Sequence, residues 1–277
     1  MSLIEKLKNI DRRIIFLIIG LSVIIPLIVP LNLPISVSPP VQATYDYVES
    51  IPEGSTILMA FDYDPGTMPE LYPMSIAFMR HCFRKNHKII AVSIWPFGAP
   101  LARDAFNQVG EGEYGKVYGI DFVNLGFVPG DVVAIKALAR SFREISPKDV
   151  DNKPIESFPI MQGIDNFDNI DFVFELSAGF PGIPEWVMIV YGRHKKPMAS
   201  GCTAVSYPQY SPYYQSGQLK GLLGGLKAAA EYEVLIGMPE KAVSGMDAQS
   251  IAHAVIVFFV IVGNVFYFID SRKRKKI

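Results

Sequence analysis

Two long apolar runs without any charged residue constrain this chain most strongly. Residues 14–31 hold 18 such positions, and residues 251–269 hold 19. At about 1.5 Å per residue, each run would form a helix roughly 27–29 Å long, which matches the hydrocarbon core of a bilayer. A core helix of a soluble protein usually carries a polar stripe instead. The sequence therefore predicts two transmembrane helices, at 14–31 and 250–269.

Basic residues flank both predicted spans on their outer sides. The tail 1–13 holds four Lys or Arg, and the tail 270–277 holds five. Because basic flanks stay in the cytoplasm, we expect both termini there and the intervening residues on the other side of the cell membrane. A secretory signal cleaved after "PVQA" (40–43) fits less well, since the apolar run is long and Ala43 lies twelve residues beyond it.

The segment between the spans is acidic. The chain has 26 basic and 27 acidic residues, of which nine and three lie in the tails, so 17 and 24 remain and give a net charge of −7. Such a domain is a poor match for nucleic acid, and the bilayer is the expected partner. Its two cysteines, Cys82 and Cys202, could pair in an oxidising compartment, although buried free thiols are the commoner case.

Residues 32–43 are rich in proline and predict an extended stalk, followed by one domain over 44–246. Five apolar segments in that domain predict strands: 55–63, 88–95, 116–126, 170–178 and 197–207. Segments with helical spacing alternate with them: 69–86, 99–109, 131–145, 183–194 and 215–236. This alternation predicts an α/β fold, a Rossmann-like three-layer domain with a mostly parallel sheet, flanked by the two transmembrane helices.

In an open α/β sheet, ligands bind outside the carboxyl ends of the strands. Polar and small residues fall at such ends, and the tyrosine-rich segment 206–218 reads as a polar loop that could contact a ligand. The predicted ligand-binding residues are Ser93, Trp95, Ser177, Gly179, Tyr207 and Tyr210.

The stretch "DYDPGT" joins the first predicted strand to the helix that follows it. It resembles the aspartyl nucleophile motif of haloacid dehalogenase-like phosphatases, although Pro65 intrudes before Gly66. The resemblance covers about ten residues and implies Asp62 as nucleophile, Asp64 as acid/base and Ser93 as the second-strand hydroxyl, with Mg²⁺. The alternative is a turn in which the Asp-Pro-Gly sequence merely ends a strand.

Other residues suggest contacts between subunits or helices. The glycines of the predicted helix 215–236 permit close backbone approach, and Asn264 would lie level with Gly20 and Ser22 in an antiparallel helix pair. The predicted interface residues are Tyr213, Tyr214, Gly221, Gly224, Gly225 and Asn264.

No histidine spacing typical of a metal site and no nucleotide-binding fingerprint occurs, so no metal and no cofactor is expected. The strand ends also lack a full catalytic set. The sequence therefore favours a membrane-anchored extracytoplasmic binding or scaffold protein, in a homo-oligomer or with a membrane-complex partner. The alternatives are a Mg-dependent phosphatase-like hydrolase and an accessory subunit of a transport or secretion complex.

Overall fold

The computed structural model describes residues 11–274, which divide into two compact units. One unit, residues 35–238, is an α/β domain. The other contains the chain up to residue 34 and from residue 239 onward, and its described part is built from two helices.

A six-stranded, all-parallel sheet forms the centre of the α/β domain, in the order β3-β2-β1-β4-β5-β6. The predicted parallel α/β architecture is thereby confirmed. The strands are β1 (Thr56–Asp62), β2 (Lys88–Ser93), β3 (Phe122–Phe127), β4 (Phe172–Ser177), β5 (Met198–Cys202) and β6 (Leu222–Gly224).

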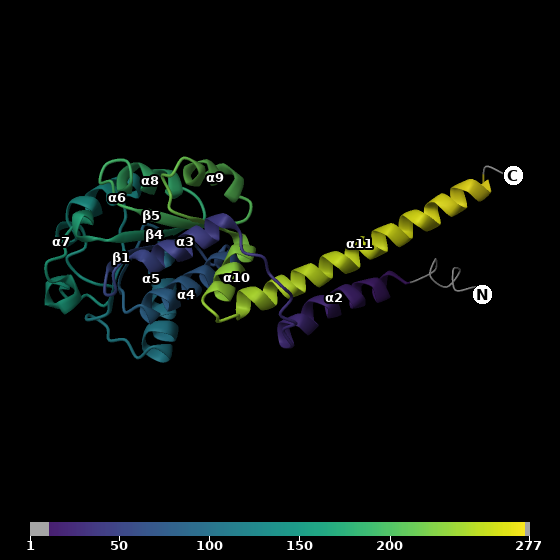
Figure 1. Cartoon of the computed structure of the whole chain (residues 1–277), viewed down its shortest axis with the longest axis horizontal. Coiled ribbons are helices and arrows are strands. Elements are labelled where there is room, and N and C mark those ends of the chain that lie inside the picture. The colour runs from purple at the N-terminus through teal and green to yellow at the C-terminus, as the bar shows by residue number, and fades with distance from the viewer. Residues whose placement is uncertain (1–10, 275–277) are drawn as a thin grey trace. The chain divides into compact units, whose positions relative to one another are not determined.

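Helices cover both faces of this sheet (Figure 1). On one face lie α3 (Pro39–Ser50), α4 (Met68–Arg84), α5 (Gly98–Ala105) and α10 (Gly225–Leu235). On the other lie α6 (Asp131–Arg140), α7 (Phe142–Ile145), α8 (Ile183–Val190) and α9 (Tyr207–Gln215). The domain also contains a π-helix, η1 (Phe106–Glu113), and three short 3-10 helices, η2 (Ile155–Ser157), η3 (Pro159–Met161) and η4 (Phe167–Asn169).

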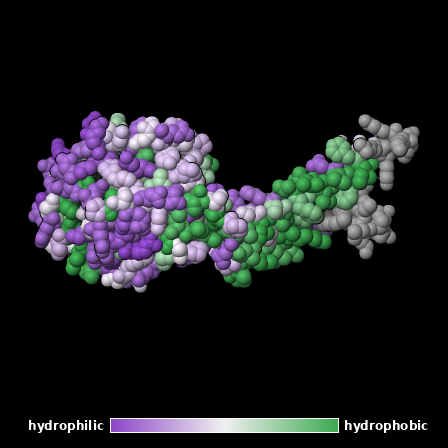
Figure 2. Space-filling model, in the orientation of Figure 1, coloured by the Kyte–Doolittle hydropathy of each residue, from purple (hydrophilic) through white to green (hydrophobic). Residues whose placement is uncertain are grey.

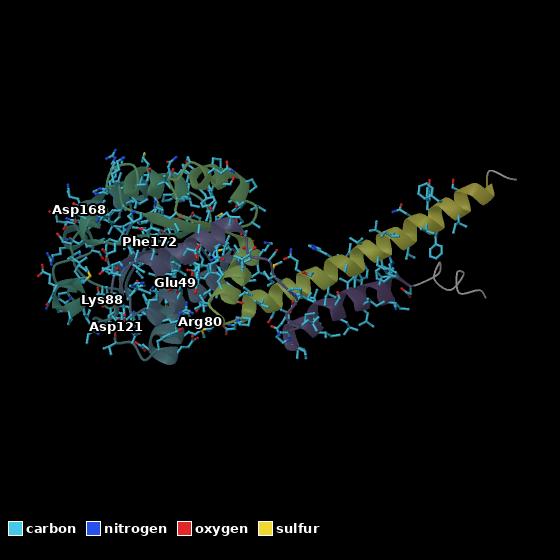
Figure 3. The ribbon with its side chains drawn as sticks, in the orientation of Figure 1. Glu49, Arg80, Lys88, Asp121, Asp168 and Phe172 are labelled. Carbon is cyan, nitrogen blue, oxygen red and sulfur yellow. The ribbon has the colours of Figure 1, made fainter. Side chains whose placement is uncertain are left out.

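Aromatic side chains hold the layers together on both faces. Phe78 of α4 stacks on Phe174 of β4 with ring centroids 3.8 Å apart, and Trp186 of α8 stacks on Phe167 at 6.1 Å. Arg80, labelled in Figure 3, donates to both carboxylate oxygens of Glu113 at 2.7 Å and so ties α4 to η1. The core thus lies in two layers, one on each side of the sheet.

The predicted stalk and the last predicted helix of the domain differ from the structure. The expected extended stalk at 32–43 is wrong beyond residue 38, because α3 begins at Pro39, and proline is well accommodated in the first turn of a helix. The predicted helix 215–236 is also wrong over its first half. There the chain forms β6, and Gly225, at φ +67°, turns it into α10.

The second unit contains α2 (Arg12–Ile28) and α11 (Lys241–Arg274), and apolar residues cover both (Figure 2). Within residues 11–274, one helix is long and apolar enough to cross a membrane, by length and composition: the part of α11 from Lys241 to Ile269. The prediction of two such helices is therefore not met. Helix α2 has 17 residues and ends before Pro30, which disfavours helical backbone at Val29.

One carboxylate joins the ends of these two helices. Asp247 of α11 is buried and accepts the backbone N–H groups of three successive residues after α2, Leu31, Asn32 and Leu33, at 2.8–3.0 Å. Helices α2 and α11 run antiparallel (Figure 1).

The predicted hydrogen bond between these helices is wrong. The Asn264 amide donates to Val260 O of its own helix at 2.9 Å, and Ser22 Oγ donates to Ile19 O at 2.7 Å. Each of these polar side chains therefore forms its hydrogen bond with a backbone carbonyl of its own helix.

Candidate binding site at the carboxyl edge of the sheet

The strand order reverses direction between β1 and β4. Open α/β sheets bind ligands at such a point, outside the carboxyl ends of the strands. The loops that meet here are 63–67 after β1, 94–97 after β2 and 178–182 after β4. The sequence predicted a site at this edge of the sheet.

Asp62 ends β1 and is fully buried. Its Oδ1 accepts from Ile94 N at 2.6 Å and its Oδ2 accepts from Trp186 Nε1 at 2.8 Å. Burial raises the pKa of Asp62 to about 7, although these two hydrogen bonds act in the opposite direction. Asp64 is half-buried, and its Oδ1 accepts from Thr67 N at 3.1 Å. Both carboxylates therefore bind the protein's own backbone and indole groups, as a structural role requires.

Four of the predicted ligand-binding residues lie where the strand order reverses, and they pack into the space between the loops that meet there. Ser93 Oγ is buried, lies 2.6 Å from Phe61 O and accepts from Trp95 N. Trp95 reaches across to the loop after β4, where its Nε1 donates to Pro181 O at 3.2 Å. A Cβ on Gly179 would stand 3.3 Å from that indole ring.

Ser177 lies deeper still, beneath Gly182, where a Cβ would come within 2.8 Å of Ser177 Oγ. The structure therefore brings together the residues that the sequence placed at these strand ends. They pack on one another, and none of them lines the pocket beside β6 or the cavity beside β3 that are described below.

The tyrosine-rich segment is a helix, α9, so the prediction of a polar loop is wrong. Tyr210 is 6% exposed and belongs to the core under α8. Tyr207, Tyr213 and Tyr214 are partly buried and pack against the same core. Packing within the domain accounts for these aromatic residues.

The three glycines near β6 also contact their own domain. A Cβ on Gly221 would lie 1.9 Å from Thr44 Oγ1 of α3, and one on Gly224 would lie 2.3 Å from the Tyr207 ring. Gly225 has φ +67°. Close approach of α3 and α9 to β6 thus requires these glycines, and the sequence argument for an intersubunit contact loses its basis.

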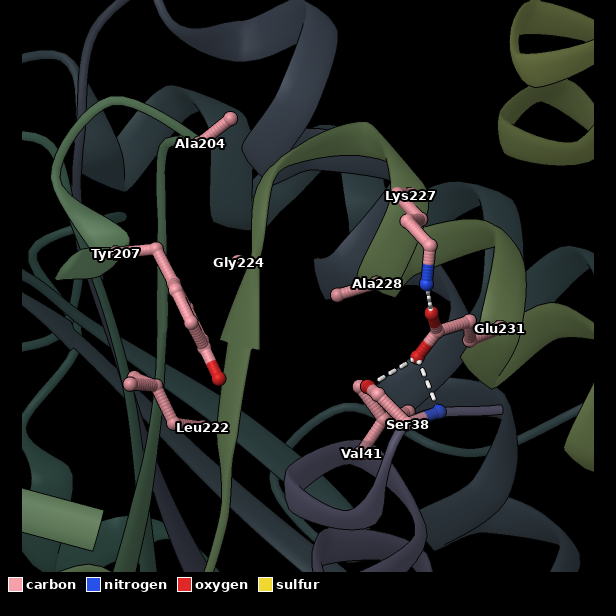
Figure 4. A pocket seen from close by; sticks show the side chains of 9 residues that line it. All are labelled: Ser38, Val41, Ala204, Tyr207, Leu222, Gly224, Lys227, Ala228 and Glu231. Carbon is pink, nitrogen blue, oxygen red and sulfur yellow. Dashed lines mark hydrogen bonds and ion pairs between the residues drawn. The ribbon is translucent and has the colours of Figure 1, made fainter. Parts of the chain in front are cut away.

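An open pocket of about 300 Å³ lies beside β6 (Figure 4). The Tyr207 ring stands on one side, and the polar side chains of Ser38, Lys227 and Glu231 stand on the other. We call it the α3–α9–α10 pocket. Its lining residues are Ser38, Val41, Ala204, Tyr207, Leu222, Gly224, Lys227, Ala228 and Glu231.

Glu231 organises the polar side of this pocket. It is 1% exposed and accepts from Ser38 N at 3.0 Å, from Ser38 Oγ at 2.5 Å and from the Lys227 ammonium, with which it forms an ion pair. The Lys227 side chain is 56% exposed, and this pair uses one of its three N–H groups. Lys227 is therefore held in place with donors left for a ligand.

Of the residues that line this pocket, the sequence predicted Tyr207 as a ligand contact and Gly224 as an interface residue. It missed Ser38, Lys227 and Glu231. The only sequence signal for the polar side is the spacing of Lys227 and Glu231 by four residues on a helix, which favours an ion pair.

A second cavity, of about 290 Å³, lies beside the edge strand β3. Two of its polar side chains have partners within the domain: Arg103 forms an ion pair with Asp151, and the Tyr118 hydroxyl donates to Asp149 at 2.8 Å. Over residues 11–274, no group of three or more His, Cys, Asp or Glu could hold a metal ion. Cys82 and Cys202 are buried free thiols.

Comparison of the chain with models of protein families, with curated proteins and with solved structures found no match.

Proposed function

We propose that this chain is a membrane-anchored binding protein whose α/β domain takes a small ligand in the α3–α9–α10 pocket. One observation carries the proposal: this pocket is open and places the Tyr207 ring opposite the Lys227 ammonium, which an ion pair holds in position. At the strand ends, by contrast, both oxygens of Asp62 already accept hydrogen bonds from the protein. Ligand sites of proteins are mostly apolar concavities with a few placed polar groups.

The pocket chemistry points to a compact ligand with a flat apolar part and hydrogen-bond acceptors. Val41, Leu222 and Ala228 supply apolar surface, and the Tyr207 ring supplies a flat face. The Lys227 ammonium can donate to a carboxylate, a phosphate or hydroxyl oxygens. A volume of about 300 Å³ suits a single-ring molecule.

The membrane part of the proposal is a two-pass arrangement with both termini in the cytoplasm and the α/β domain outside. Its support is the apolar length of α11, the apolar surface of α2 packed beside it and the basic residues of the two tails. The residues that follow α2 extend its apolar run to Leu31.

A hydrolase built on Asp62 is less well supported. A nucleophilic carboxylate needs an oxygen that reaches the substrate. The Asp62 carboxyl is fully buried, and each oxygen accepts a hydrogen bond from the protein. A scaffold role is also less well supported, because the glycines and tyrosines predicted to contact another subunit pack within their own domain.

The pocket can be tested by filling it. Ala204 is exposed and lines the pocket, so Ala204→Trp should occupy the space without disturbing the core. We expect single-ring carboxylate fragments to bind the full chain in detergent, as measured by ligand-observed NMR. Ala204→Trp should weaken that binding at least tenfold.

The matched control is Val205→Trp, which adds the same ring one residue later. Val205 is 88% exposed and does not line the pocket, so binding should be unchanged. Fragments that bind the wild type and Ala204→Trp equally would place the binding site elsewhere.

A further inference from the structure

A second polar cluster lies inside the α/β domain, apart from the α3–α9–α10 pocket. At its centre is Glu175 on β4, whose in-register neighbours are Ala60 on β1 and Ser200 on β5. Ser177, two residues further along β4, points to the same face because side chains alternate along a strand. We call Glu175, Ser177 and Ser200 the Glu175 cluster.

Every member of the cluster is fully buried. Both carboxylate oxygens of Glu175 and the hydroxyl oxygens of Ser177 and Ser200 lack a hydrogen-bond partner within the described part of the chain. The two hydroxyl groups face the carboxyl group and favour its charged form, yet neither completes a hydrogen bond of normal geometry. Buried polar atoms are almost always paired, so four unpaired ones side by side indicate a missing partner.

The charged groups that face Glu175 are acidic. They are Asp62 on β1 and Glu185 on α8, and the neighbouring Cys202 on β5 and Tyr210 on α9 are uncharged at neutral pH. Burial, followed by the charge of Asp62, raises the pKa of Glu175. An ionised Glu175 would therefore have no positive side chain beside it.

We propose that the Glu175 cluster binds a dehydrated monovalent cation, and that Na⁺ is the ion that fits it. Carboxylate and hydroxyl oxygens are hard ligands, which suit alkali and alkaline-earth ions and not zinc or copper. Mg²⁺ usually keeps several water molecules, which a fully buried cluster does not accommodate. A single carboxylate balances a single positive charge, so a monovalent ion would neutralise the charge of Glu175 itself.

Such an ion would stabilise the pairing of β4 with β5, because its ligands come from both strands. Ser200 is also in register with Leu222 of β6, which lines the α3–α9–α10 pocket. The cation site would therefore support the wall of the pocket without belonging to it. The inference stands whether or not that pocket binds a ligand.

The test is the melting temperature of the full chain in detergent at pH 8, in NaCl and in choline chloride at equal ionic strength. We expect Na⁺ to raise the melting temperature by about 2–4 °C in a saturable manner, as expected for a ligand at several times its dissociation constant. The shift should be smaller at pH 5, because protons compete with Na⁺ for Glu175.

Two variants remove ligands of the ion. Glu175→Gln should abolish the Na⁺-dependent shift, and Ser200→Ala should reduce it to less than half. Ser216→Ala, at an exposed serine of the same domain, should keep it in full. If Glu175→Gln does not fold, Ser200→Ala decides alone.

Either of two results would overturn the cation site. One is a wild-type melting temperature equal in NaCl and choline chloride. The other is a Na⁺-dependent shift that Ser200→Ala leaves intact. In both cases a buried water molecule, or a proton on Glu175, would account for the unpaired atoms of the cluster.

Discussion

Asp62 reaches two donors that lie far apart in the sequence, Ile94 N after β2 and Trp186 Nε1 in α8. Each donor meets a different oxygen of the carboxyl group. A carboxyl group can accept on both sides, whereas an amide has a single oxygen. Asp62 therefore fastens the loop after β2 and helix α8 to the end of β1.

Asp62→Asn tests this structural role. The NH₂ group of asparagine would face one of the two N–H donors, so one buried donor would lose its acceptor. We expect a loss of about 1–3 kcal/mol in the free energy of unfolding. The measurement is chemical denaturation of the full chain in detergent.

Asp64→Asn serves as the comparison, because Asp64 is half-buried and asparagine suits a turn as well as aspartate does. Its cost should stay within about 0.5 kcal/mol. An Asp62→Asn variant of unchanged stability that loses a Mg²⁺-dependent aryl phosphatase activity would instead establish the hydrolase.

The sequence located several edge residues correctly but could not assign their roles. Asp62, Ser93 and Ser177 end strands as expected, because apolar runs show where strands stop. Their partners cannot be inferred from local pattern. Ser38 and Glu231, which form one side of the pocket, are 193 residues apart and meet only in the folded chain.

Among the secondary-structure elements, α3, α4 and α10 meet at one buried histidine, His81. Its Nε2 lies 2.9 Å from Glu49 (labelled in Figure 3) and its Nδ1 lies 2.8 Å from the Tyr232 hydroxyl. Because the Glu49 carboxylate only accepts, Nε2 carries the proton and Nδ1 accepts from Tyr232. The Tyr45 ring stacks on the imidazole at 4.6 Å. A neutral imidazole thus joins the three helices.

This arrangement makes stability depend on pH. Burial lowers the pKa of His81 from 6.5 to about 4. Between pH 6.5 and pH 4, the histidine is protonated more readily in the unfolded chain than in the folded protein. The contribution of neutral His81 to the stability of the folded protein is therefore fully present above pH 6.5 and is lost as the pH falls towards 4. The difference in the free energy of unfolding between the wild type and His81→Gln should decrease by up to about 3 kcal/mol over that range. Denaturation curves of both proteins at pH 7 and pH 4.5 measure it.

An equal difference in stability between the wild type and His81→Gln at the two pH values would mean that folding does not change the pKa of His81, and would contradict this account.

The sequence predicted the strands and helices better than it predicted the residues of the candidate site. Four of the six strands lie within predicted segments, and β3 extends one residue beyond its segment. Buried parallel strands can be recognised because they are continuous apolar runs. Strand β6 was missed since it has three residues and ends in glycine, and β5 supplies its pairing. Helix α3 was missed since its two leading prolines resemble a linker.

For the whole molecule, two features matter to function. The unit with α2 and α11 provides one helix long and apolar enough to cross a membrane, with a second apolar helix tied to it through Asp247. The α/β domain provides the α3–α9–α10 pocket, whose polar side is fixed by Glu231. Together they support the proposal of a membrane-anchored protein that binds a small ligand.

Native mass spectrometry of the full chain, purified from membranes of the cells that produce it, tests that claim most directly. We expect a small molecule to remain bound to the wild type and to Val205→Trp, and to be absent from Ala204→Trp, whose indole fills the pocket. A wild-type spectrum without any bound mass, or a bound mass that Ala204→Trp retains, would contradict a ligand in the α3–α9–α10 pocket.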